Sequence, residues 1–133
     1  MQEPSIFIKI VNGEIPSHKV YEDDTTLAFL DIFSPVPGHV LVIPKKQVDA
    51  LWDLDNSDYA AVMETVKKVA RKQREALGVA RVGVKVVGVD VPHAHVHLIP
   101  FDDVKIYHEA GLRNIEPDQD ALSAMEKKLK LTS

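Results

Sequence analysis

The spacing of hydrophobic residues in the first third of the chain indicates short β-strands. Val20–Asp24 and Leu27–Asp31 have the pattern of two strands about a polar turn, and Gly38–Pro44 has the pattern of a third. An earlier apolar run, Ile6–Val11, ends at Asn12 and Gly13. This run is short enough to form either a brief helix or a strand, and its periodicity does not separate the two.

The pattern changes to a helical one at Asn56. From there to Gly78, apolar residues recur at intervals of three and four, which predicts one long helix. Valine-rich Arg81–Val89 and alternating Pro92–Phe101 predict two more strands, and Pro117–Leu131 predicts a terminal helix. Strands in runs with one long helix are typical of an α+β fold. We therefore predict an antiparallel β-sheet with one long helix and shorter terminal helices, forming a single domain over residues 1–133.

Composition narrows the classes of function. The chain has 45% hydrophobic and 27% charged residues, as folded globular proteins do, and its formal net charge of -4 disfavours binding to nucleic acid. The absence of cysteine excludes disulfides and thiolate chemistry. The first ten residues contain Glu3, Pro4 and Lys9, so we expect neither a signal peptide nor a membrane span, and a cytoplasmic protein.

The most informative pattern is an alternation of histidines. His93, His95 and His97 are separated by the apolar residues Ala94 and Val96. On a β-strand, alternate residues share a face, so the three imidazoles are expected on one side, with neighbouring Cα atoms about 6.7 Å apart. A sheet face made of imidazoles predicts a site of chemistry or binding.

Nucleophilic catalysis is the first use of such a face. A neutral imidazole attacks phosphorus when one ring nitrogen holds a proton that an acceptor orients. His95 lies between two other histidines, which can donate hydrogen bonds to phosphoryl oxygens. Because neither an arginine nor a glycine-rich phosphate loop lies nearby in the sequence, histidines are the expected donors.

Metal binding is the second use. A His-x-His pair supplies two ligands from a strand, and a zinc site needs a further ligand from elsewhere. The candidates for that ligand are His18, Asp31, His39, Asp90 and His108. The alternating histidines thus leave a metal-dependent hydrolase as an alternative.

At this point the chain resembles the histidine-triad superfamily, in the branch that contains the nucleoside phosphoramidases. The family motif alternates histidine with apolar residues and ends in two apolar positions, and residues 93–99 fill it completely. The segments Ser5–Pro16, Leu27–Ile32 and Gly38–Lys46 agree in the family's order. The resemblance covers about residues 5 to 101 and implies an α+β domain that pairs into a homodimer.

The resemblance also implies a substrate class and roles for individual residues. The substrate would be a purine nucleoside monophosphate derivative, such as a nucleoside phosphoramidate, an aminoacyl adenylate or a dinucleoside polyphosphate, and no cofactor is expected. By matching position, His95 would be the nucleophile, with His97 and His39 on the phosphate and His93 supporting the triad. The expected nucleotide-binding residues are Asp31 for the ribose and Ile6, Phe7, Ile10 and Ile32 for the base.

Two departures from the family pattern qualify these expectations. Ser5, Ile8 and Gln47 occupy positions where many bacterial relatives have zinc ligands, which predicts that this chain has no structural zinc. The loop before the triad is shorter than usual, and Asp90 falls where a phosphate-contacting serine or threonine is typical. As an ionised carboxylate, Asp90 would repel a phosphate, whereas as a carboxylic acid it would protonate the leaving group. This leaves a non-catalytic AMP-binding module as a further alternative.

Overall fold

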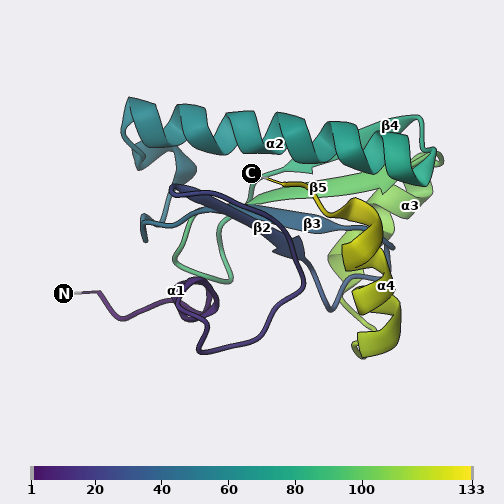
Figure 1. Ribbon diagram of the computed structural model, residues 1–133, viewed down its shortest axis with the longest axis horizontal. Helices are drawn as coiled ribbons and strands as arrows, with labels where there is room; N and C mark the ends of the chain where they lie inside the picture. Colours follow the sequence, from purple (N-terminus) through teal and green to yellow (C-terminus); the bar gives the residue numbers. More distant parts are fainter. Residues whose placement is uncertain (1, 133) are drawn as a thin grey trace.

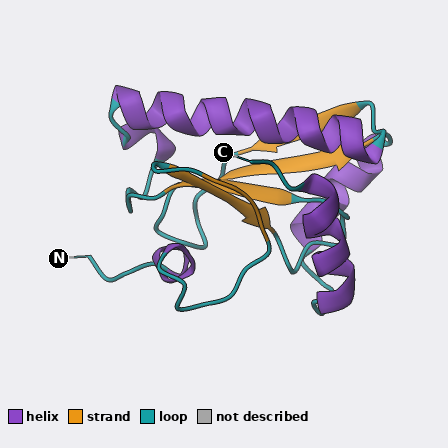
Figure 2. Ribbon diagram, viewed as in Figure 1, coloured by secondary structure: helices purple, strands orange, loops and turns teal. Residues whose placement is uncertain are grey.

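A computed structural model describes residues 2–132 and contains one five-stranded antiparallel sheet (Figures 1 and 2). The strand order is β1-β2-β3-β5-β4. The strands are β1 (Lys19–Glu22), β2 (Thr26–Leu30), β3 (Val40–Pro44), β4 (Arg81–Lys85) and β5 (Val96–Phe101). The helices are α1 (Ile6–Val11), α2 (Asn56–Leu77), α3 (Val104–Glu109) and α4 (Gln119–Leu129), with short 3-10 turns η1 (Leu51–Asp53) and η2 (Ala110–Leu112). The predicted α+β class is confirmed.

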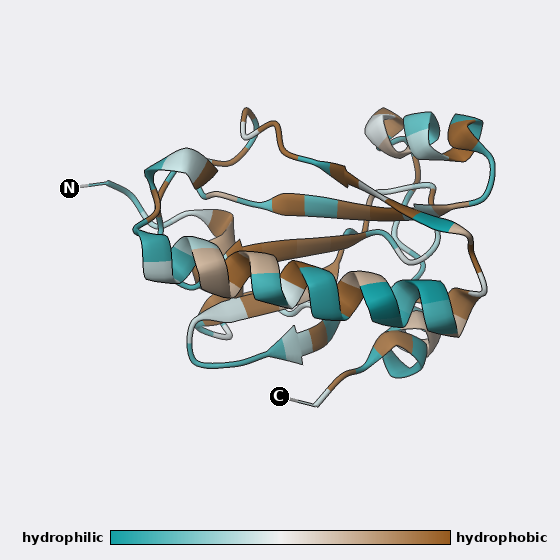
Figure 3. Ribbon diagram, turned by 90° about the horizontal axis from the view of Figure 1, so that it is seen from above, coloured by the Kyte–Doolittle hydropathy of each residue, from teal (hydrophilic) through white to brown (hydrophobic). Residues whose placement is uncertain are grey.

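Helix α2 lies along one face of the sheet, and α1 lies on the opposite side (Figure 1). The α2 helix begins after Asp55, whose side chain accepts a hydrogen bond from the Asp58 amide, and ends at Gly78 in a left-handed conformation. Hydrophilic and hydrophobic residues alternate along this helix (Figure 3), and Val62, Val66 and Val69 pack against the strands. Buried Gln73 fastens this helix to the sheet by donating to the carbonyls of Gly38 and Leu98.

Strands β2 and β3 are buried on both faces because their side chains alternate between two cores. Ala28 and Val42 pack in the core beneath α2, together with Val62 and Val66 of that helix. A second core lies between the sheet and α1, and its buried members are Phe7, Ile10, Leu27, Phe29, Leu41 and Ile43. This packing decides the ambiguous first run in favour of a helix, which Ser5 caps by accepting a hydrogen bond from the Ile8 amide.

Two predicted strands are shorter than expected, and the difference falls at the histidines. Strand β4 ends at Lys85 rather than Val89, and β5 begins at Val96 rather than Pro92. The backbone turns before β5, because the His93 amide donates to the Val91 carbonyl and the Ala94 amide to the Val48 carbonyl. The prediction that all three histidines lie on one strand is therefore wrong for His93 and His95.

The C-terminal segment completes the domain. Helix α4 packs against α2 and β1, and confirms the predicted terminal helix. Helix α3 and turn η2, which sequence patterning did not predict, follow β5, and Ala110 and Gly111 of η2 line the cavity described below. Within residues 2–132, no helix combines the length and apolar content needed to cross a bilayer.

Candidate active site

A cavity of about 320 Å³ opens on the α1 side of the sheet. Its size falls within the range of small-molecule sites. The cavity brings together residues from α1, the ends of β2 and β3, the segment before β5, β5 itself and the C-terminal segment. The predicted site residues in its lining are Ile6, Phe7, Ile10, Asp31, Ile32, His39, Asp90, His95 and His97. His93 is fully buried behind this lining.

Aromatic rings form a continuous row along the wall of the cavity. The Phe7 ring lies edge-on to His93 and His95, with centroids 5.7 and 5.1 Å away. The row continues from His95 to His97 at 5.2 Å and from His97 to His39 at 5.1 Å. Ala94 and Val96 point into the core on the opposite side. The predicted separation of imidazoles from apolar side chains is therefore confirmed, although β5 supplies only its last histidine.

The hydrogen bonds of His93 fix its tautomer. Its Nε2 lies 2.7 Å from the Pro44 carbonyl, which can only accept, so Nε2 carries the proton. Nδ1 is then an acceptor, and the Ser5 hydroxyl donates to it over 2.8 Å. Burial lowers the pKa of His93, which keeps this ring neutral, while the hydrogen bond to Pro44 acts in the opposite direction.

His95 takes its orientation from the main chain of His93. Its Nδ1 lies 2.7 Å from the His93 carbonyl and must therefore donate. The lone pair is left on Nε2, which has no hydrogen-bond partner among residues 2–132 and is not enclosed by protein atoms. An imidazole with a bound Nδ1 proton and an accessible Nε2 lone pair is arranged for nucleophilic attack.

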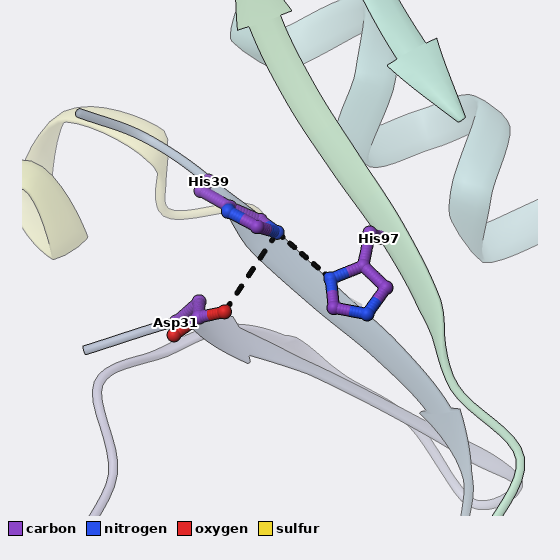
Figure 4. Close-up of side chains that lie close together, drawn as sticks. All are labelled: Asp31, His39 and His97. Carbon is purple, nitrogen blue, oxygen red and sulfur yellow. Dashed lines mark hydrogen bonds and ion pairs between the residues drawn. The ribbon is translucent and has the colours of Figure 1, made fainter. Parts of the chain in front are cut away.

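His39 and His97 form a hydrogen-bonded pair, shown in Figure 4, with His39 Nε2 2.9 Å from His97 Nδ1. The Asp31 carboxylate lies 3.8 Å from His39 Nε2 and favours a proton on that nitrogen. We therefore assign His39 as the donor to His97. The Ser34 hydroxyl then donates to His39 Nδ1 over 2.8 Å, and His97 keeps its proton on Nε2.

Both members of this pair are neutral at neutral pH. Burial lowers the pKa of His39 to about 4, although the Asp31 carboxylate raises it. Burial and, to a smaller extent, the neighbouring histidines His39 and His95 together lower the pKa of His97 to about 3. The pair can therefore donate hydrogen bonds to a ligand but contributes no positive charge.

Asp31 lies just after β2, with a side chain that is 1% exposed. One carboxylate oxygen accepts a hydrogen bond from the Phe33 amide over 3.0 Å. The other accepts one from the Arg113 guanidinium, which also stacks over the Phe33 ring. The carboxylate therefore carries a compensated charge at the edge of the cavity.

Arg113 and Lys85 line the cavity and were not found from the sequence. Histidines were expected as the phosphate donors because no arginine lies nearby in the sequence, but the fold brings Arg113 to Asp31 across 82 residues of chain. No local pattern marks Arg113. Lys85 carried a usable signal, because Arg81, Gly83 and Lys85 alternate with Val82 and Val84 along the sequence. In the fold, Lys85 pairs directly with His97 between β4 and β5.

One group of residues among those described has the geometry of a metal site. Its members are Asp31, His39 and His97, whose ligand atoms all lie within 4.8 Å of one another. This group includes only one residue of the His-x-His pair that the sequence suggested. In this conformation, His39 and His97 are hydrogen-bonded to each other, and the Asp31 carboxylate accepts a hydrogen bond from Arg113.

The positions expected for structural zinc in relatives hold a different set of groups. Gln47 accepts a hydrogen bond from the Ser5 amide over 2.9 Å and donates to the carbonyls of Glu3 and Pro92. The Ser5 hydroxyl donates a hydrogen bond to His93 and accepts one from the Ile8 amide. A hydroxyl, a carboxamide and the alkyl side chain of Ile8 do not form a zinc donor set, so these residues do not fit the metal.

Comparisons with known proteins agree with this geometry. The family model for the HIT domain matches residues 12–104. The chain belongs to the HIT, or histidine-triad, family. It is 35% identical over 125 residues to adenosine 5'-monophosphoramidase HNT1 of Saccharomyces cerevisiae, covering 93% of this chain and 79% of that protein. It is 35% identical over 106 residues to the purine nucleoside phosphoramidase of Escherichia coli K12, covering 74% and 88%.

Solved structures give the same result for the fold. A HIT-like protein from Bartonella henselae superimposes with a TM-score of 0.83 at 33% identity, covering 98% of this chain and 97% of that one. Together, the relatives confirm the predicted family and the prediction of a histidine-triad enzyme, since those named for an activity are hydrolases.

Proposed function

We propose that the protein hydrolyses purine nucleoside phosphoramidates and related α-phosphate derivatives through a nucleotidyl intermediate on His95. The observation that carries the proposal is the hydrogen bond from His95 Nδ1 to the His93 carbonyl, 2.7 Å long, which leaves the Nε2 lone pair free at the cavity. The relatives named as phosphoramidases support this substrate class.

In the first step, His95 Nε2 attacks the α-phosphorus in line with the leaving group. A bond forms between Nε2 and phosphorus, while the bond from phosphorus to the amine nitrogen breaks. The amine leaves with the electron pair of that bond and takes up a proton from solvent, and the water that attacks in the second step returns a proton to solvent. His97 donates from Nε2 to a phosphoryl oxygen and so stabilises the charge that develops there.

In the second step, water attacks the same phosphorus. The bond to Nε2 breaks, its electron pair returns to His95, and the nucleoside monophosphate is released. Because Nδ1 keeps its proton on the His93 carbonyl throughout, His95 departs as a neutral imidazole. A neutral leaving group is one reason that the intermediate can be hydrolysed.

The remaining lining residues account for binding of the nucleoside. Phe7 and Ile10 offer an apolar surface on α1 for the base, flanked by Ile6 and Ile32. Asp31 accepts hydrogen bonds from the ribose hydroxyls, because a carboxylate keeps acceptor capacity after its contacts with Phe33 and Arg113. Asp90 is exposed and lines the cavity, and we assign its carboxyl group to protonation of the leaving group, with the proton taken up from solvent.

The test is release of AMP and ammonia from adenosine 5'-phosphoramidate by the purified protein. We expect turnover that persists after treatment with a chelator and is lost in His95→Asn. His108→Asn is the matched control, because His108 is an exposed histidine outside the cavity. AMP binding without turnover would favour the AMP-binding module, and loss of activity with the chelator would favour the metal enzyme.

We also propose that the protein forms a homodimer through β4. This strand lies at the edge of the sheet, where its backbone groups are available for pairing. Val84 is 52% exposed on this strand, and Val86, Val87 and Val89 continue an exposed apolar surface beyond it. Light scattering after gel filtration should give a mass twice that of the chain, and Val84→Lys should shift it toward the monomer.

The cytoplasm is the proposed location. A cysteine-free chain forms no disulfides and needs no oxidising compartment to fold. Fractionation of cells that express a tagged protein tests this location.

A further inference from the structure

Any nucleotide bound next to His95 brings negative charge into a cavity whose lining is mostly apolar. A buried charge needs a counter-charge, because the protein interior does not solvate ions as water does. His39 and His97 are neutral at neutral pH and supply hydrogen bonds only. Arg113 is already matched by the Asp31 carboxylate. The residues assigned so far therefore leave the phosphate charge uncompensated.

Lys85 is placed to supply the missing charge. It is the last residue of β4, and its Cα pairs directly with that of His97 on β5. Directly paired residues extend to the same face of a sheet, and both Lys85 and His97 line the cavity. Across residues 2–132, no carboxylate lies within ion-pair distance of Lys85, so its charge is available.

The surroundings of Lys85 direct its side chain along the cavity. Its Nζ lies beside Gly111 of turn η2, 3.6 Å from the position that a Cβ atom would take there. The positive charge of Lys85 lowers the pKa of both His39 and His97, in addition to the larger effect of burial. The field of Lys85 thus reaches the histidines that border the phosphate position.

We propose that Lys85 is a further phosphate-binding residue, whose ammonium group compensates the charge of the α-phosphoryl group at His95. This inference rests on the proposed function. It also accounts for the short segment 86–92, which lacks the serine or threonine expected there, since a cation on the adjacent strand supplies the contact instead. During both transfer steps, Lys85 stabilises negative charge on the phosphoryl oxygens.

The first experiment measures affinities for AMP and for adenosine by calorimetry. A charge-assisted hydrogen bond contributes enough that Lys85→Gln should weaken AMP binding by roughly 10- to 100-fold. Adenosine affinity should change less than about twofold, because adenosine lacks the phosphate. Lys85→Arg should retain most of the AMP affinity. Arg81→Gln is the matched control, since it removes a cation from the same strand outside this cavity.

Equal AMP affinity in wild type and Lys85→Gln would overturn the inference while leaving the proposed function intact. Equal weakening of AMP and adenosine would also overturn it, because it would indicate a purely structural effect. Wild-type protein that binds no AMP would refute the proposed function itself. Thermal unfolding of each variant, with Lys85→Met as a second neutral replacement, shows whether the fold is retained.

A second experiment separates the α-phosphoryl group from the leaving group. We expect Lys85→Gln to lower kcat/KM for adenosine 5'-phosphoramidate and for ADP by similar factors, because the two substrates share the α-phosphoryl group. A loss confined to ADP would overturn the assignment, since it would place the Lys85 contact on the departing phosphate. A loss on both substrates with unchanged AMP affinity would limit Lys85 to the transition state and overturn its role in binding.

Discussion

The Ser5 hydroxyl lies 2.8 Å from Nδ1 of His93, and this contact joins the start of helix α1 to the histidine triad. The same hydroxyl accepts the Ile8 amide and thereby caps the helix. His93 in turn presents its carbonyl to His95. One serine therefore sets both the beginning of the helix that borders the cavity and the orientation of the proposed nucleophile.

Replacing Ser5 with alanine should reduce both stability and activity. Loss of a helix cap and of a buried hydrogen bond should together lower the free energy of unfolding by roughly 1–3 kcal/mol. Freed of its partner, His93 should hold His95 less well, so we expect kcat to fall roughly three- to tenfold. Urea denaturation and steady-state turnover of adenosine 5'-phosphoramidate measure the two effects.

Asp118→Ala is the matched control for Ser5→Ala. Asp118 caps helix α4 by accepting the Ala121 amide and lies outside the cavity. This variant should lose the stability of a helix cap, about 1 kcal/mol, and keep full activity. If Ser5→Ala also kept full kcat, the connection from Ser5 through His93 to His95 would have no catalytic role.

Stability should fall as the solution becomes acidic, in a pH range set by the buried histidines. Their pKa values are about 4 for His39 and about 3 for His97, whereas an unfolded histidine titrates near 6.5. Between these values the unfolded chain binds protons that the folded chain does not. The free energy of unfolding therefore decreases as the pH falls from about 6.5, by up to about 1.4 kcal/mol per pH unit for each histidine.

Urea denaturation between pH 7.5 and 4.5 measures this dependence. His39→Asn should flatten it, because one of the titrating groups is gone. Asp23→Asn should not, since the pKa of Asp23 is about 2 and its effect is confined to more acidic solution. A wild-type stability that stays constant across the range would contradict the assignment of neutral histidines.

Asp31→Asn should reduce the preference for ribose over deoxyribose. A neutral amide accepts hydrogen bonds less strongly than a carboxylate, so kcat/KM for ribonucleotide substrates should fall roughly tenfold relative to 2'-deoxy analogues. Arg113→Gln leaves the carboxylate in place and should keep the preference. Unchanged discrimination in Asp31→Asn would remove Asp31 from ribose recognition.

Gly38→Ala tests the turn that leads into β3. Gly38 has a φ of +83°, and an added Cβ would lie 2.7 Å from Cδ1 of Leu77. Strain and crowding should lower the free energy of unfolding by roughly 2–4 kcal/mol. Gly78→Ala has a φ of +66° with nothing within 4 Å of the added atom, so it should lose only about 1–2 kcal/mol. Chemical denaturation compares the two variants, and equal losses would mean that the Leu77 contact relaxes without penalty.

The sequence predicted those parts of the fold whose pattern is local. The alternation of Leu27–Asp31 and Gly38–Pro44 predicted β2 and β3, and the three- and four-residue spacing from Asn56 predicted α2. The first apolar run was ambiguous because six residues fit either element, and packing of Phe7 and Ile10 against the sheet decided it. The predicted start of β5 was wrong because the alternation of histidine and apolar residues extends beyond the residues that pair with neighbouring strands.

The candidate site was predictable as far as its residues lie in recognisable motifs. His39, His95 and His97 were found together with the apolar residues of α1, and all of them line one cavity. Arg113 was not found, because its contact with Asp31 depends on how the chain after β5 folds back across the sheet. An ion pair between residues so far apart in sequence produces no recognisable pattern of residues in either segment.

The His93 carbonyl is available to His95 only because regular sheet pairing begins three residues later, at Val96. Had the ladder continued through His93, neighbouring strands would compete for its main-chain groups. The orientation of the proposed nucleophile thus depends on the absence of strand pairing at residues 93–95. A substitution that lengthened β5 toward Pro92 would add sheet hydrogen bonds and stability. It would also remove the acceptor that orients His95, so a more stable strand would make the protein less reactive.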